Sequence, residues 1–243
     1  MKDHLLDIVQ HTHGLGVIDL VKIIGDENET RLEAIAEDRS VVVQAKFKGP
    51  VAEFIGTFGM PNLGKLKTIL NIEVYREDAQ INVTRRDRDG VKVPEGIHFE
   101  NKLGDFKNDY RFMSSEIVNE MLKSVKMKPV PWSIDIVPTA ASIQRLRFQA
   151  MANSDETTFI AKTDNGDLKF FFGDHSSHAG NFVFSSGVSG SLNKPWAWPV
   201  GVVISILNLP GDKTFKISND GAAMITVDSG IADYNYILPA QTK

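Results

Sequence analysis

The sequence predicts an α+β protein in which two similar domains each pack two short helices on antiparallel sheets. Runs rich in β-branched residues recur along the 243 residues and are separated by turn pairs such as Asn165-Gly166. A few short segments instead show the spacing of an amphipathic helix. Helices and strands follow in the same order on both sides of a proline-containing connector. We therefore expect an N-terminal domain at 1–113, an interdomain connector at 114–131 and a C-terminal domain at 132–243.

The first domain is predicted to begin with a helix over residues 3–13. Leu5, Ile8 and Val9 follow the i, i+3, i+4 spacing of one helical face, and two glycines then end the helix. Pro61 begins a second helix that ends near Asn71, because the first turn needs no N–H group from proline. Strands are expected at 17–24, 31–36, 41–48, 72–75, 80–85, 97–100 and 109–113.

The positions of proline, glycine and serine help to predict the connector and the elements of the second domain. Pro129 and Pro131 favour an extended connector. Thr139 caps a predicted helix at 140–152. A Gly- and Ser-rich segment at 185–192 stands where the second helix of this domain is expected, and it holds a short helix at most. Strands are expected at 132–137, 157–162, 168–172, 181–184, 200–207, 215–218, 223–227 and 233–238.

The composition excludes several classes of protein. The chain has no cysteine, so disulfides, thiolate metal sites and cysteine nucleophiles are absent. No apolar run approaches the roughly 20 residues that span a bilayer, and the N-terminus lacks the apolar block of a signal peptide. We expect a soluble intracellular protein without a membrane partner.

Two basic stripes stand out in a chain whose formal net charge is −4. One contains Lys65-Leu66-Lys67 and the other contains Arg145-Leu146-Arg147. An acidic protein with basic helices can contact nucleic acid through one surface and repel it with the rest. On an ideal helix Lys65 and Arg145 lie opposite the apolar face, whereas Lys67 and Arg147 lie near it and would have to snorkel. The alternative is an ordinary solvated helix face.

Three segments, together with the order of the elements, resemble the sliding clamps, the DNA polymerase processivity factors, most closely those of T4-type bacteriophages. Residues 54–66 are similar to the strand-to-helix segment of the first clamp domain. Residues 128–132 resemble the end of the interdomain connector, and residues 231–240 resemble the last strand with its closing Leu-Pro pair.

The resemblance implies a DNA-clamp fold that assembles head to tail into a homotrimeric ring around duplex DNA. It implies no catalysed reaction, no cofactor and no metal. The partners would be DNA of any sequence, a DNA polymerase and an ATP-driven clamp loader, with transcription factors left open, in the cytoplasm of an infected bacterium. The side chains expected to face DNA are Lys2, Lys65, Lys67, Arg145, Arg147 and Lys194.

The resemblance and the apolar content of the connector also predict a groove for a partner peptide. Pro239 and the preceding Leu238 in the last strand are expected to form one wall of the groove. The connector is expected to supply the other residues: Ile117, Met121, Leu122, Val125 and Met127. The alternative is that these connector residues pack in the core.

Other activities receive less support from the sequence. His11 and His13, with His4 upstream, do not have the spacing of a metal site on one helix face. No phosphate-binding loop or nucleophile motif is present. Trp196 and Trp198 are interpreted as packing anchors, with a partner-facing or DNA-facing role as the alternative. The rival to a clamp is a strand-rich viral structural or assembly protein that oligomerises through its sheet edges.

Overall fold

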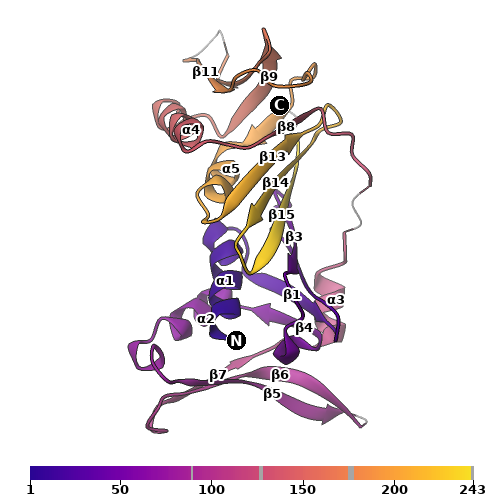
Figure 1. Cartoon of the computed structure of the whole chain (residues 1–243), viewed down its shortest axis with the longest axis vertical. Helices are drawn as coiled ribbons and strands as arrows, with labels where there is room; N and C mark the ends of the chain where they lie inside the picture. Colours follow the sequence, from indigo (N-terminus) through magenta and orange to yellow (C-terminus); the bar gives the residue numbers. More distant parts are fainter. Residues whose placement is uncertain (89, 126–127, 175–177, 242–243) are drawn as a thin grey trace. The chain divides into compact units, whose positions relative to one another are not determined.

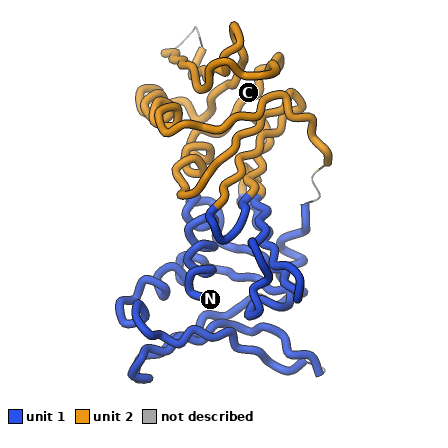
Figure 2. Tube along the Cα trace, viewed as in Figure 1, with its two compact units in different colours: residues 1–37, 43–125, 229–234 blue, residues 38–42, 126–228, 235–243 orange. Residues whose placement is uncertain are grey.

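The computed structural model describes residues 1–88, 90–125, 128–174 and 178–241. The chain forms two compact units (Figures 1 and 2). Unit 1 comprises residues 1–37, 43–125 and 229–234, and unit 2 comprises residues 38–42, 126–228 and 235–243. None of the helices in the described ranges combines the length and apolar character that crossing a bilayer requires.

Unit 1 contains two antiparallel sheets and three α-helices. The strand order is β4-β1-β2-β3 in one sheet and β5-β6-β7 in the other. The helices are α1 (Lys2–His11), α2 (Leu63–Leu70) and α3 (Ser115–Met121). The strands are β1 (Leu20–Gly25), β2 (Thr30–Ile35), β3 (Val42–Phe47), β4 (Gly56–Pro61), β5 (Gln80–Arg88), β6 (Val91–Glu100) and β7 (Lys107–Arg111).

Helices α1 and α2 cover one face of the first sheet. Alternate strand residues such as Val21, Ile23 and Phe58 point to this face and are fully buried. On α1, the His4 ring lies 5.9 Å from the ring of Phe47 in β3, which belongs to the same face. Helix α2 contacts α1, so the two short helices form one layer (Figure 1).

A buried polar network ties the first helix of unit 1 to a segment near the end of the chain. The Asp7 carboxylate accepts hydrogen bonds from the hydroxyl groups of Tyr234 (2.8 Å) and Ser229 (3.1 Å). The His11 ring lies 3.2 Å from the same carboxylate and stacks on the Tyr234 ring at 4.7 Å. His11 is therefore part of the core, not of an exposed site.

In its described residues, unit 2 likewise has two antiparallel sheets, with two α-helices instead of three. The strand orders are β15-β14-β13-β8 and β11-β10-β9-β12. A cluster of phenylalanine rings packs between the two sheets: Phe170 lies 4.4 Å from Phe184 and 6.4 Å from Phe215. Its elements are β8 (Ile134–Ile136), α4 (Ala140–Ala152), β9 (Thr158–Asp164), β10 (Asp167–Phe172), β11 (Gly180–Ser185), β12 (Ala197–Pro199), α5 (Val200–Leu207), β13 (Asp212–Ile217), β14 (Ala222–Asp228) and β15 (Ala232–Pro239).

The cap predicted for the second-domain helix is confirmed. Thr139 Oγ1 accepts a hydrogen bond from Ser142 N–H at 3.1 Å, and Ser142 Oγ accepts one from Thr139 N–H at 3.0 Å. Helix α4 then packs on β11, where a Cβ atom added to Gly180 would lie 2.4 Å from Gln149 Oε1. The glycine lets the helix approach the strand closely.

The strand predicted at 200–207 is wrong, because these residues form α5. Val200, Val203 and Leu207 are buried at helical spacing. An apolar run of eight residues fits a buried strand as well as a buried helix, and its β-branched residues favoured the strand. The segment at 185–192, where a short helix at most was expected, holds no helix: the described structure there ends β11 and continues as bends and irregular chain.

Two further sequence predictions need correction. Residues 73–75 form a single 3-10 turn instead of part of a strand, because the N–H groups of Tyr75 and Arg76 bond to the carbonyl oxygens three residues before them. Residues 115–121 of the connector form α3 instead of an extended segment.

The strand β4 was anticipated only through the resemblance of residues 54–66 to a strand-to-helix segment, because Gly56 and Gly59 hide its alternation. Pro61 ends this strand, and α2 begins at Leu63 instead of Pro61.

Gly59 allows α3 to approach β4, and its substitution tests that packing. A Cβ atom there would lie 2.9 Å from Val118 Cγ2 and 3.0 Å from Met113 Cβ. We expect Gly59→Ala to lower the free energy of unfolding by roughly 1–3 kcal/mol in urea titrations, because the overpacked contact must open.

Gly64→Ala is the matched control, because an added Cβ atom in α2 would make only an ordinary 3.4 Å contact with His13. Alanine is the better helix former, so this variant should be neutral or more stable by about 0.5–1 kcal/mol. Equal losses for both variants would contradict the close packing of α3 on Gly59.

Candidate nucleic-acid interface

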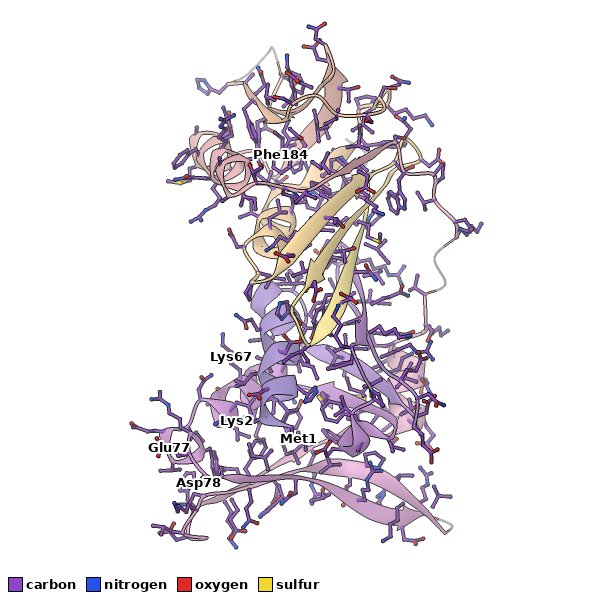
Figure 3. All side chains as sticks on the ribbon, viewed as in Figure 1. Met1, Lys2, Lys67, Glu77, Asp78 and Phe184 are labelled. Carbon is purple, nitrogen blue, oxygen red and sulfur yellow. The ribbon has the colours of Figure 1, made fainter. Side chains whose placement is uncertain are left out.

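Helix α2 presents two lysines from opposite flanks. Leu66 is fully buried, and Lys65 and Lys67 beside it are both exposed. Successive residues on an α-helix are rotated by about 100°, so a leucine that points into the core directs both neighbours outward. Lys67 is therefore equivalent to Lys65 and does not have to snorkel past apolar residues (Figure 3).

Helix α4 repeats this arrangement in unit 2. Leu146 is fully buried, and Arg145 and Arg147 are exposed on its two sides. Within the described part of the chain, neither these arginines nor the two lysines of α2 take part in a salt bridge or a side-chain hydrogen bond. Four positive charges on two helices thus remain available to a partner.

Helices α1, α2, α4 and α5 carry little negative charge. Of the 31 acidic residues in the chain, only Asp3 and Asp7 lie in α1, α2, α4 and α5, and Asp7 is buried. Lys2, Lys65, Lys67, Arg145 and Arg147 lie in the same helices. Among the described residues, the other acids lie in α3, which holds Glu116 and Glu120, or in strands, 3-10 turns and loops. This distribution suits a polyanionic partner at the helices.

Two of the basic residues predicted from the sequence have partners within the chain. Lys2 Nζ donates hydrogen bonds to the carbonyl oxygens of Tyr75 (2.6 Å) and Arg76 (3.2 Å). It therefore holds the turn after α2 and is not a free DNA contact (Figure 3). Lys194 is exposed, and its Nζ lies 5.9 Å from the centroid of the Trp196 ring.

The two tryptophans are placed as packing anchors. Trp198 in β12 is buried. Trp196 is partly buried, and its indole N–H donates a hydrogen bond to the carbonyl oxygen of Asn219 at 2.7 Å.

Residues 115–125 of the connector lie on the face of the unit 1 sheet opposite α1 and α2. Lys22 in β1 points to this face, is 1 % exposed and forms an ion pair of 2.8 Å with Glu33. Its Nζ also donates to the carbonyl oxygen of Leu122 and to Ser124 Oγ, both at 2.9 Å. Gln44 binds the carbonyl oxygen of Val125 at 2.8 Å. These bonds hold the connector against the sheet.

The residues predicted to form a peptide groove divide into two groups. Ile117, Met121 and Val125 are exposed on α3 and the connector, and Pro239 is exposed at the end of β15. Met127 lies outside the described residues.

Two of the predicted groove residues are buried. Leu238 is fully buried, because it alternates in β15 with outward residues, and it cannot form a groove wall. Leu122 is 8 % exposed and packs inward below the Lys22 contact.

No protein-family model matches the chain, and no curated protein matches it by sequence. Its fold is similar to that of PCNA from Thermococcus kodakaraensis, with a TM-score of 0.66, 12 % identity and coverage of 98 % of this chain and 97 % of that chain. It is also similar to PCNA of A. fulgidus bound to the C-terminal region of FEN-1. That match has a TM-score of 0.69, 10 % identity and coverage of 100 % and 96 %. The chain therefore has the PCNA-like clamp fold, an α+β architecture of antiparallel sheets and a few short helices.

The Lys22 ion pair can be tested by removing one or both partners. Lys22→Ala should cost roughly 3 kcal/mol of unfolding free energy, because it leaves the Glu33 carboxylate without its cation and the connector carbonyl without a donor at a largely buried site. Hydrogen exchange of residues 115–125 should become faster in this variant. The double variant Lys22→Met with Glu33→Leu should recover most of the stability. If Lys22→Ala left exchange in the connector unchanged, the anchoring role would be wrong.

Proposed function

We propose that this protein is a sliding clamp, a ring that encircles duplex DNA and tethers a DNA polymerase as its processivity factor. The observation that carries the proposal is the pair of basic–Leu–basic helices, whose four cations lack partners among the described residues in a chain of net charge −4. Its PCNA-like fold supports the same function.

The charges suit binding that permits sliding. Duplex DNA carries about one negative charge per 1.7 Å of axis, and contacts to phosphate carry no sequence information. Lys65, Lys67, Arg145 and Arg147 can attract the phosphates without fixing a register. Helices α1, α2, α4 and α5 supply no exposed carboxylate except Asp3 to repel the backbone. The role is mechanical and needs no catalytic residue.

Ring closure is proposed to use two sheet edges, β7 and β11. The other edges of their sheets are covered: Arg85 of β5 binds the carbonyl oxygens of Glu53 and Ile55, and β12 pairs with Gln241. Each copy would pair its β7 with β11 of the next copy, head to tail, in a trimer of two-domain protomers with domains at 1–113 and 132–243. Pairing would satisfy backbone groups that an open edge leaves to water.

The partner site is proposed on the exposed connector of unit 1. Ile117, Met121 and Val125 offer apolar side chains there, and the Lys22 contacts hold their backbone in place. In the A. fulgidus structure the C-terminal region of FEN-1 is bound to PCNA, and we propose that a polymerase or clamp-loader segment docks on this connector. A T4-type phage setting, in the cytoplasm of an infected bacterium, would supply both partners. Transcription factors are further candidates for the same surface.

Charge reversal tests the DNA-facing helices. Lys65→Glu with Arg145→Glu should weaken binding to linear duplex DNA at low salt, and should lower the slope of log K against log [salt] by about one per lost phosphate contact. Fluorescence anisotropy across a salt series measures both quantities.

Lys92→Glu with Lys162→Glu changes the net charge by the same amount at exposed residues of β6 and β9. This control should bind DNA nearly as the wild type does. If both double variants lost affinity equally, overall charge and not the α2 and α4 surface would govern binding.

A proline in β7 tests the proposed ring interface. Phe112 N–H bonds to Glu95 O and Asn101 N–H bonds to Phe106 O, so alternate residues of β7 face β6 and Lys107 N–H points to the open edge. Lys107→Pro removes that donor. Light scattering should then show the solution mass shift from three times 26.9 kDa, the mass of a trimer, toward the 26.9 kDa of a single chain.

Lys107→Ala loses the 3.2 Å ion pair with Glu100 but keeps the backbone donor. It should remain a trimer. A wild-type monomer at every concentration would contradict the ring itself.

A further inference from the structure

Helices α2 and α4 differ along their most exposed ridge. In α2 the residues two before and two after the buried leucine are Gly64 and Thr68. In α4 the equivalent residues are Gln144 and Phe148. The Phe148 side chain is 59 % exposed, although a large aromatic ring in water costs free energy that a serine or lysine would avoid. The ring lies between Arg145 on one flank of α4 and Arg147 on the other.

A groove lies beside this ring, between α4 and the C-terminal end of α5. It has a volume of about 410 Å³, within the range of roughly 300–1,000 Å³ typical of small-ligand sites. The buried Leu207 contributes apolar surface, and Phe148 and the 75 % exposed Met151 line the groove from α4. The polar lining consists of the amides of Gln144 and Asn208 and the guanidinium of Arg147.

We propose that this groove binds an unpaired nucleotide of single-stranded DNA. The Phe148 ring stacks on the base, the amides of Gln144 and Asn208 bind the base edge, and Arg147 pairs with the phosphate. A nucleotide has a planar apolar face, a hydrogen-bonding edge and an anionic phosphate, and the lining of this groove complements all three. The inference rests on the proposed function, because it makes α4 the place where a clamp on duplex DNA also holds an adjoining unpaired strand.

Duplex DNA alone does not account for the groove. Its bases are stacked inside the helix and present no face to Phe148, whereas its phosphates require only the arginines. An apolar peptide would use the phenylalanine, methionine and leucine but would gain nothing from two arginines in a helix without a single acid. The positive charge on both flanks of Phe148 therefore favours a nucleotide.

Two DNA probes separate base stacking from phosphate binding. One is a blunt duplex, and the other is the same duplex with an unpaired thymidine tail of about ten nucleotides, long enough to cover one single-strand binding site. Their affinities are measured at low salt by fluorescence anisotropy, with free ends so that a closed ring can thread. We expect Phe148→Ala to weaken binding of the tailed probe about tenfold and of the blunt probe less than about twofold.

Three variants make the comparison specific. Phe148→Tyr keeps an aromatic ring and should retain the preference for the tail. Phe148→Leu keeps apolar area without a ring and should lose the preference, as alanine does. Val137→Ala truncates a side chain that is 71 % exposed in unit 2 but does not line the groove, and it should bind both probes as the wild type does.

Each contrary result has a separate meaning. If wild-type protein binds the blunt duplex in a salt-dependent way and the tail adds nothing, this inference fails and the proposed clamp function stands. If neither probe binds, both fail. If Phe148→Ala lowers the solution mass and leaves the ratio of the two affinities unchanged, a second copy of the chain covers the groove and the nucleotide site is refuted.

Discussion

Both units depend on one constraint, which is that two short helices must cover one face of an antiparallel sheet. The strands alternate buried and partly exposed residues, as in the regular pattern of β14. Without the helices, the residues of the buried face would be exposed to water. Helices of 8 to 13 residues offer only a narrow apolar stripe. Each therefore places its leucines and valines inward and leaves the remaining circumference to polar and charged side chains.

This constraint explains why the basic residues stand where they do. In a basic–Leu–basic triplet the leucine is fixed by the core, so the two cations emerge about 100° to either side of it. Packing and charge are then specified by the same three residues. On the other face of the unit 1 sheet, the fully bonded ammonium of Lys22 has a comparable effect, because it orders a connector that would otherwise lie loosely on the sheet.

The sequence was sufficient for most of the antiparallel strands, the first helix and the capped helix after Thr139, because periodicity and capping are local signals. The general clamp architecture came instead from the resemblance to the sliding clamps. The sequence was insufficient for α5, whose run of valines and isoleucines fits a strand equally well. Burial could not be assigned from residue type either: Leu238 and Leu122 point inward while Ile117 and Met121 point outward. Lys2 was misjudged because its carbonyl partners are more than 70 residues away. A helical-wheel comparison of the two basic helices would have shown that Phe148 lies on the outward face of its helix, where the other helix has a threonine.

The Asp7–Tyr234 hydrogen bond spans 227 residues, and it joins the first helix of unit 1 to a segment that follows the sequence-continuous part of unit 2. Unit 1 therefore cannot complete this buried network until residues 229–234 are in place. Before that, α1 can pack on strands that are near it in the sequence, but the Asp7 carboxylate lacks the hydroxyl group of Tyr234. Contacts of such long sequence separation slow folding. The sequence-continuous part of unit 2 can become compact without them, and a truncation before residue 229 would affect the N-terminal unit as well.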